Sequence, residues 1–259
     1  MRDSNRFSLV LLVLSLWMVL PGHSRAQRDF FDLPPLPPPE AFGDLRIDRV
    51  SGENDVKPVY FSHWTHRSAY TCRVCHFELG FEMQTNLTEI TESANRKGEF
   101  CGACHDGETA FGHTEENCAK CHAGSPADRR KSFRQFRKSL KLPEAPFGNR
   151  IDWVEALESG LIQPRNGILD PDFEPIPFNE EFEVPAAWTL IPPADFSHDI
   201  HLQWLECSNC HPDIFKIKKR ATEHFLMKHI LEGKFCGTCH MTVAFPLDDC
   251  QRCHPDMRR

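Results

Sequence analysis

Beyond its first 26 residues, the sequence lacks any apolar run long enough to span a membrane, so we expect no membrane span there. It also lacks an excess of basic residues. Without those 26 residues, 27 Lys and Arg stand against 36 Asp and Glu, a formal net charge of −9. Such a balance disfavours nucleic acid and anionic membrane surfaces as partners. No Ser/His/Asp set, phosphate-binding loop or paired carboxylates stand out, which argues against several common classes of enzyme.

The one apolar run, residues 7–20, lies near the N-terminus. Two Arg precede it, and the small residues Ser24 and Ala26 lie shortly before Gln27. This order is typical of a secretory signal peptide. We therefore predict a signal peptide over residues 1–26 and export to the periplasm, the outer surface or the extracellular space. An uncleaved N-terminal anchor is the alternative.

The cysteines occur only in pairs. Each Cys-x-x-Cys pair is followed at once by His. The twelve cysteines are Cys72, Cys75, Cys101, Cys104, Cys118, Cys121, Cys207, Cys210, Cys236, Cys239, Cys250 and Cys253. The histidines that follow them are His76, His105, His122, His211, His240 and His254. Cys-x-x-Cys-His is the attachment motif of c-type haem: both thiols bond to the vinyl groups of one porphyrin, and the adjacent His is the proximal iron ligand. The sequence therefore predicts six covalently bound haem c.

Disulfide frameworks and zinc sites also use paired cysteines. Neither needs a His after every second Cys, so six motifs with no Cys left over favour haem attachment. Six porphyrins would supply the apolar surface that the polypeptide has little of. We therefore expect a cofactor-organised chain, mainly α with much irregular structure and few or no strands.

The chain contains an internal repeat with an offset of 135 residues. Residues 61–66 (FSHWTH) recur as residues 196–201 (FSHDIH), and the same offset relates Cys72 to Cys207 and Cys101 to Cys236. Only the last loop differs, with twelve residues before the third motif of the first half and nine in the second. A fixed period indicates a duplicated unit. We predict two tandem three-haem modules, at residues 58–125 and 193–259.

The remaining segments contain no Cys. Residues 27–57 are predicted to be a Pro-rich N-terminal arm, with a polyproline conformation over residues 34–39. Residues 126–192 are predicted to be a linker that packs across both modules. Its basic run at 129–141 is interpreted as a solvated face. It has one short helix, from Asp152 to Ser159, because Asp152 and Glu155 match a capping box and Gly160 a stop signal.

Seven histidines remain once the six proximal ones and His23 in the signal peptide are set aside. They are His63, His66, His113, His198, His201, His224 and His229. Four of them form two His-x-x-His pairs, at residues 63–66 and 198–201, which recur at the repeat offset. Positions i and i+3 share a helix face, so one short segment can present imidazoles to two neighbouring haems. We therefore predict these four as distal iron ligands.

Phe-x-His-x-x-His followed by three Cys-x-x-Cys-His motifs resembles the multihaem cytochrome c3 superfamily, in particular its three-haem members of the cytochrome c7 type. The resemblance covers both modules but not the linker or the arm. It implies that the first His of each pair ligates the first haem of the module and the second His the second haem. The implied pairs are His63 with His76, His66 with His105, His198 with His211, and His201 with His240.

The resemblance also implies that the third haem takes its distal His from the stretch before the second motif. In the second module that stretch offers His224 and His229, of which His229 is preferred because it is nearer to Cys236. In the first module the stretch has no His, and Glu89 and Ala94 stand at the matching positions.

The haem on His122 therefore needs another ligand. His113, in the longer loop five residues before Cys118, is the first candidate. His224 from the other module, Met83 and an open, five-coordinate iron are the alternatives.

Iron with two His ligands has no free position, so it exchanges electrons rather than binding a substrate, and a low potential is expected. We predict a hexahaem electron carrier, not an enzyme, that works between redox-protein partners. One alternative is a subunit that self-associates into a haem-bearing filament. The other is a reductase that acts at an open haem on His122.

Overall fold

A computed structural model of the chain describes residues 33, 35–122, 126–186, 190–216 and 226–257. The predicted signal peptide and His224 lie outside the described residues. The chain divides into two compact units, Met1–Pro35 and Leu36–Arg259. The second unit holds both predicted modules and the segment between them.

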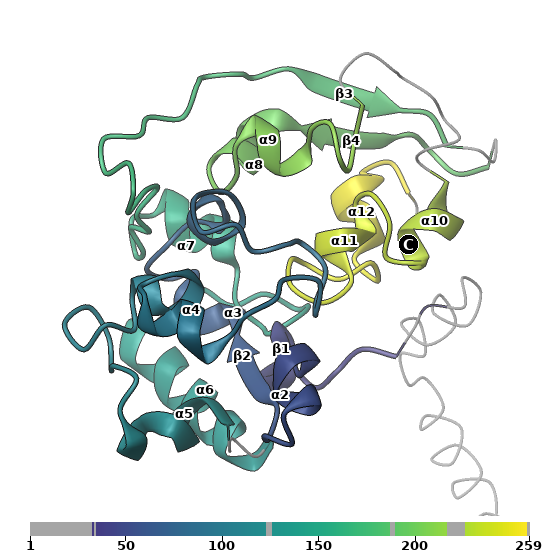
Figure 1. Ribbon diagram of the computed structural model, residues 1–259. Coiled ribbons are helices and arrows are strands. Elements are labelled where there is room, and N and C mark those ends of the chain that lie inside the picture. The colour runs from purple at the N-terminus through teal and green to yellow at the C-terminus, as the bar shows by residue number, and fades with distance from the viewer. Residues whose placement is uncertain (1–32, 34, 123–125, 187–189, 217–225, 258–259) are drawn as a thin grey trace, which may run out of the picture. The chain divides into compact units, whose positions relative to one another are not determined.

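Short helices joined by irregular chain make up most of the described residues (Figure 1). The α-helices are α2 (Arg49–Glu53), α3 (His63–His66), α4 (Glu92–Arg96), α5 (Cys118–His122), α6 (Pro126–Leu140), α7 (Trp153–Glu158), α8 (His198–Leu202), α9 (Cys207–Cys210), α10 (Met227–Leu231), α11 (Gly237–His240) and α12 (Cys250–Cys253). Three 3-10 helices, η1 (Pro39–Ala41), η3 (Phe100–Ala103) and η4 (Glu115–Asn117), and one π-helix, η2 (Val74–Glu78), complete the helical part.

The strands form two small antiparallel sheets of two strands each. They are β1 (Asp44–Ile47) with β2 (Val59–Ser62), and β3 (Glu181–Val184) with β4 (Ala194–Ser197). The prediction of a mainly helical and irregular chain with few strands is confirmed. Within the described ranges, no helix is both long and apolar enough to cross a membrane.

The N-terminal arm is shorter than predicted. Pro38 is extended, with φ −60° and ψ 153°, as in polyproline. From Pro39 onward the chain instead folds into η1, β1 and α2, and β1 pairs with β2 from Asp44↔Ser62 to Ile47↔Val59. Phe42, just before β1, is only 2% exposed. Burial of this apolar side chain and pairing with β2 join residues 39–53 to the first half, so the extended arm does not reach residue 57.

The two halves share one backbone path. In the second half, β3 pairs with β4 at Glu181↔Ser197, and α8 follows β4 as α3 follows β2. The left-handed backbone at Phe100, with φ 47°, recurs at Phe235, with φ 53°. The repeat therefore begins one strand earlier than the predicted module boundaries at residues 58 and 193.

Helices α4 and α10 are equivalent, 135 residues apart, and each packs against the second Cys-x-x-Cys turn of its half. A Cβ added at Gly102 would lie 1.8 Å from the Asn95 carbonyl oxygen. At Gly237 it would lie 2.0 Å from the Ile230 carbonyl oxygen. Only glycine allows this close approach, so the glycine after the first Cys of the second motif in each half lets that turn pack against its helix.

The segment between the halves contains two helices rather than the single one predicted. Helix α7 is confirmed: the Asp152 side chain accepts a hydrogen bond from the Glu155 N–H, and Gly160 follows with φ 71°. Helix α6, of 15 residues, was missed. The basic residues of this segment predicted a solvated face. The same helix also has an apolar face, on which Phe133 is buried and Phe136 and Leu140 pack against the core. The spacing of three and four residues between these side chains is the helical signal.

The core of the second unit is shared by both halves and the segment between them. It consists of Trp64, Phe133, Leu142, Ile151, Trp153, Ala156, Ile162 and Trp204. Trp64 comes from the first half, Trp204 from the second, and the other six from the segment 126–192. The predicted packing of this segment across both halves is confirmed, and the segment supplies most of the core.

A buried ion-pair cluster also joins the halves. Arg73, inside the first Cys-x-x-Cys motif, is 4% exposed. Its guanidinium donates to Glu206 Oε2 and to Glu78 Oε1, both at 2.6 Å, and its backbone N–H donates to the Trp204 carbonyl at 3.0 Å. Trp204 and Glu206 lie within three residues before Cys207, so the first Cys-x-x-Cys-His motifs of the two halves are neighbours.

Candidate haem-binding site

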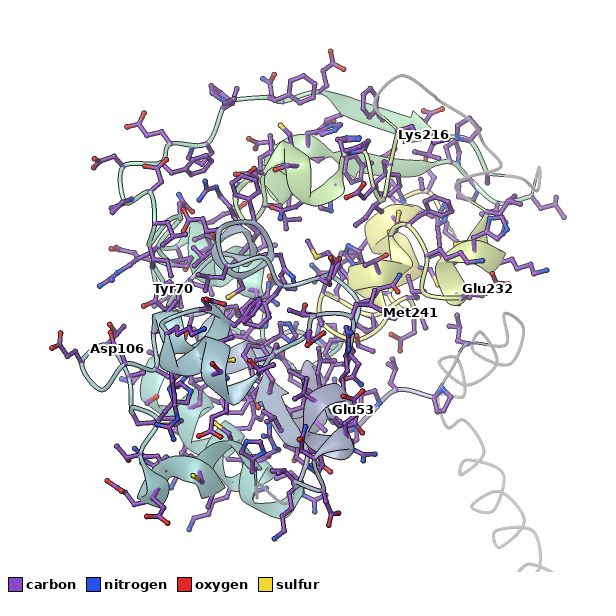
Figure 2. All side chains as sticks on the ribbon, viewed as in Figure 1. Glu53, Tyr70, Asp106, Lys216, Glu232 and Met241 are labelled. Atoms are coloured by element: carbon purple, nitrogen blue, oxygen red, sulfur yellow. The ribbon has the colours of Figure 1, made fainter. Side chains whose placement is uncertain are left out.

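The paired cysteines lie on or at the ends of short helical turns. Figure 2 shows the side chains on these elements, with all sulfur atoms in yellow. Two Cys separated by two residues share a face of such a turn, which directs both thiols to one side. All twelve are free thiols in the structure. Burial raises the pKa of Cys75 and of Cys239 to about 12. Across the described residues, no group of three or more His, Cys, Asp or Glu is arranged to hold a bare metal ion.

Each His of the six motifs has one ring nitrogen engaged. In every case Nδ1 lies 2.5–3.1 Å from a backbone carbonyl oxygen. The pairs are His76 with Phe81, His105 with Phe111, His122 with Lys57, His211 with Phe215, His240 with Phe245, and His254 with Pro192. Donation from Nδ1–H leaves the lone pair on Nε2, the tautomer that metal-binding histidines adopt.

The carbonyl acceptors recur in the repeat. Lys57 and Pro192 are 135 residues apart, and each lies two residues before the second strand of its hairpin. The hairpin of each half therefore orients the His of that half's third motif, which lies more than 60 residues away along the chain.

The two His-x-x-His pairs are held in the same way. The Nδ1 atoms of His63 and His198 lie 3.0 Å from the carbonyl oxygens of Gly43 and Glu180, the residues just before β1 and β3. The second His of each pair, His66 or His201, bonds through Nδ1 to the carbonyl of the serine that ends the preceding strand, at 3.0 and 2.7 Å. All four imidazoles therefore have Nε2 left for a metal.

Phenylalanine side chains fix the ring plane of the second His in each His-x-x-His pair. Phe61 stacks on His66 and Phe196 on His201, with centroids 4.4 and 4.5 Å apart. The phenylalanine of the Phe-x-His-x-x-His motif thus orients the second imidazole of each pair.

Three of the expected His pairs lie opposite one another. The ring centroids are 6.4 Å apart for His63 and His76, 6.3 Å for His66 and His105, and 6.2 Å for His201 and His240. A metal–imidazole bond is about 2.0 Å long and the ring centre lies about 1.15 Å further on, so two rings on opposite sides of one metal have centroids about 6.3 Å apart. Each of these pairs leaves the space that one haem iron needs.

The fourth expected pair, His198 and His211, makes no such ring contact among the described residues. Instead, the ring of His198 has the edges of Phe178, Phe182 and Phe196 around it, with centroids 4.9–5.1 Å away. Its Nδ1 bond still matches that of His63.

Burial keeps the ligand candidates neutral. It lowers the pKa of His63 to about 3 and that of His240 to about 4. It also lowers the pKa values of His66, His76 and His201. Since iron binds the neutral imidazole, these five side chains are in the form that can ligate near neutral pH.

One pair of side chains near the sites was missed from the sequence. The backbone carbonyls of Phe111 and Phe245 lie within hydrogen-bond distance of Nδ1 of His105 and His240. Their side chains pack on the same two imidazole rings, with centroids 4.4 and 4.3 Å apart. The signal was available, because each phenylalanine follows its Cys-x-x-Cys-His motif by a similar interval in both halves.

The third haem of each half is the point at which the halves differ. Helix α10 carries His229, whereas Ala94 occupies the equivalent place on α4. His113 lies beside α4, because Arg96 of that helix donates from Nη1 to the His113 carbonyl at 3.1 Å. In the described part of the chain, neither His113 with His122 nor His229 with His254 forms a ring contact. Their roles as ligands stay predictions.

Comparison with known families gives a match in both halves. The family model of cytochrome c7 and related cytochrome c matches residues 59–123 and 194–255. A comparison with curated proteins found no match.

Among solved structures, the C-terminal hexahaem fragment of the cytochrome GSU1996 is 25% identical. The match covers 85% of this chain and 99% of that fragment, with a TM-score of 0.27. The dodecahaem cytochrome c GSU1996 is 22% identical over 83% of this chain and 75% of its own, with a TM-score of 0.28. Its N-terminal hexahaem fragment is also 22% identical, over 83% of this chain and 99% of the fragment, with a TM-score of 0.26.

The family match in each half coincides with three Cys-x-x-Cys-His motifs and a Phe-x-His-x-x-His segment, which together provide six sites for covalent haem c per chain. The chain is therefore a multihaem c-type cytochrome, an electron carrier with two modules of the cytochrome c7 type.

Proposed function

We propose that this chain is a hexahaem electron carrier that works between redox-protein partners in the periplasm or at the outer surface. The observation that carries the proposal is the set of three His pairs whose rings lie 6.2–6.4 Å apart. Every imidazole in these pairs has its Nδ1 bonded to a backbone carbonyl. Imidazoles locked in this way are arranged to hold a metal between their Nε2 atoms.

Each of the six motifs attaches one haem through its two Cys, with the adjacent His as proximal ligand. The proposed distal ligands follow the repeat for the first two haems of each half and differ for the third. They are His63 for the haem on His76, His66 for that on His105, His113 for that on His122, His198 for that on His211, His201 for that on His240, and His229 for that on His254.

Two imidazoles on one iron leave no position for a substrate, so the chemistry that the bound haem supplies is one-electron exchange. The residues of the chain orient the imidazoles, cover the rings with phenylalanines and hold the sites in a fixed order. For this reason we propose no catalytic residue for the six-coordinate sites.

The two halves act as one conductor rather than as two tethered carriers. Arg73, in the first motif of one half, hydrogen-bonds to Glu206 and Trp204, which shortly precede the first motif of the other. The shared core packs against both halves at this junction. A rigid junction keeps the distance between haems of different halves constant. Electron transfer between them then needs no docking step.

The proposed location, in the periplasm or at the outer surface, rests on the sequence of the N-terminal residues. The order of charge, apolar run and small residues over 1–26 favours export, and haem attachment through thiols suits the same compartment.

Mass spectrometry of the intact purified protein tests the proposal. The expected mass is that of the chain from Gln27 plus six haems. Replacing both Cys118 and Cys121 by alanine should remove one haem mass, and the same change at Cys250 and Cys253 is the matched control in the second half. Fewer than six haem masses in the unmodified protein would contradict the proposed count.

A reductase acting at the haem on His122 is the second candidate, because Ala94 stands on α4 where α10 carries His229, so the first half lacks the equivalent ligand. An open iron there would take up carbon monoxide or cyanide rapidly, at one equivalent per chain. A six-coordinate iron would not.

A further inference from the structure

Arg67 lies where the two halves and the segment between them meet. It follows the second His of the first His-x-x-His pair. Its guanidinium carbon is 4.5 Å from the ring centroid of Trp153 and 4.8 Å from that of Trp204. Trp153 belongs to α7 and Trp204 to the second half, and each indole is 7% exposed. The cation is therefore held between two aromatic faces in the shared core.

The Arg67 guanidinium has no carboxylate partner in the described part of the chain. No ion pair or side-chain hydrogen bond involves it there, and its Nε is buried without an acceptor. Two other arginines of this unit are neutralised: Arg73 by Glu78 and Glu206, and Arg129 by Asp44. Arginine keeps its proton even when buried, so Arg67 places a full, uncompensated positive charge at the junction.

This charge lies beside two predicted haem sites. The Arg67 N–H donates to the His63 carbonyl at 2.9 Å, and Cys72 packs against the core cluster that holds the two tryptophans. The positive charge acts on Cys72 and Cys239, and it contributes to lowering the pKa of His63 and of His240. These residues belong to the sites on His76 and His240, one in each half.

The haem bonded to Cys72 is not expected to neutralise this charge. Thioether bonds form at the vinyl-bearing edge of a porphyrin, whereas the propionates lie on the opposite edge. A cation beside Cys72 is therefore away from the propionates of that haem. The two carboxylates of the junction, Glu78 and Glu206, are bonded to Arg73.

We propose that Arg67 is a potential-setting residue that raises the reduction potentials of the haems on His76 and His240, so that electrons in a partly reduced chain reside at the junction. The inference rests on the proposed function. Reduction of a ferric site takes one electron from the redox partner and adds one negative charge there. A cation held between two buried indoles, with no carboxylate partner among the described residues, stabilises that added charge.

The test is a spectroelectrochemical titration of the full haem-loaded protein, with the haem methyl resonances followed by NMR during stepwise oxidation to assign each transition. Arg67→Gln and Arg67→Met remove the charge, Arg67→Lys keeps it, and Arg46→Gln removes an exposed charge from the same half as a control. In the neutral variants, the ratio of reduced to oxidised haem at a fixed potential should fall about tenfold at the His76 and His240 sites. For a one-electron couple this is a shift of about 59 mV. Arg67→Lys and Arg46→Gln should titrate like the wild type.

Each outcome decides between the possibilities. Unchanged potentials in a neutral variant that retains six haem masses would overturn the proposal. Loss of haem from both neutral variants would also overturn it, because Arg67 would then be needed for assembly rather than for the potential. A wild-type protein without attached haem would instead contradict the proposed function.

Discussion

Arg73 Nε donates a 2.6 Å hydrogen bond to Glu206 Oε2 across 133 residues of sequence. The side chain of Arg73 is 5% exposed and that of Glu206 17%, so the pair is shielded from water. The bond connects the residue between Cys72 and Cys75 to the residue before Cys207. It fixes the relation between the two halves at the point where their first haem sites meet.

The first prediction concerns the stability of this junction. Arg73→Met should lower the free energy of unfolding by about 3 kcal/mol, because Glu78 and Glu206 would be left without their buried counter-charge. The Cys-x-x-Cys spacing is kept, so all six haems should remain attached. Denaturant unfolding measures the loss. The matched control is Arg46→Met, which breaks an exposed ion pair with Asp48 and should cost less than about 0.5 kcal/mol. Equal effects of the two changes would contradict a special role for the junction.

The second prediction concerns the order of the distal ligands. His66→Ala should convert the haem on His105, and principally that one, to the high-spin state, because the His66 ring lies 6.3 Å from that of His105. His201→Ala should do the same to the haem on His240, whose ring centroid lies 6.2 Å from that of His201. Resonance Raman and NMR spectra identify the affected haem. If the haem on His76 changed in place of that on His105, the ligand order would be wrong.

The third prediction concerns the haem on His122. Arg96 ties the loop of His113 to α4, the helix that has Ala94 where α10 has His229. His113→Ala should therefore leave five haems unchanged and make one iron high-spin, able to bind carbon monoxide or cyanide. His229→Ala is the matched change for the haem on His254.

A His113→Ala variant with the wild-type spectrum would remove His113 as the ligand. A methionine-to-iron charge-transfer band in the wild type would then favour Met83, and rapid uptake of one ligand per chain would favour an open iron. Neither signal would indicate His224.

The fourth prediction concerns the two close backbone approaches. Gly102→Ala and Gly237→Ala should each destabilise the protein by about 2 kcal/mol or more, because the new Cβ meets a carbonyl oxygen 1.8 or 2.0 Å away. Gly52→Ala is the control, since an added Cβ there has no atom within 4 Å and lies in helix α2. Thermal unfolding with haem content measured in parallel checks the result. Tolerance of both substitutions would contradict the packing of the second motif against α4 and α10.

The sequence by itself determined the chemistry of this protein. A Cys-x-x-Cys-His motif is complete within five residues, and His63 and His66 lie on one helical turn, so both can be recognised without knowing the path of the chain. The cap at Asp152 and the stop at Gly160 are local for the same reason. The offset of 135 residues that relates the two halves is likewise visible in the printed sequence.

Only the tertiary structure decided how these parts are held. The carbonyl of Lys57 meets His122 across 65 residues, and Arg67 lies between Trp153 and Trp204, which come from different segments. Helix α6 shows the same limit, since its charged residues dominate the sequence while Phe133 and Phe136 join a core built from both halves. Contacts of this kind form between residues far apart in sequence. Spacing within the chain does not encode them, because they depend on how separate segments bury their apolar faces together.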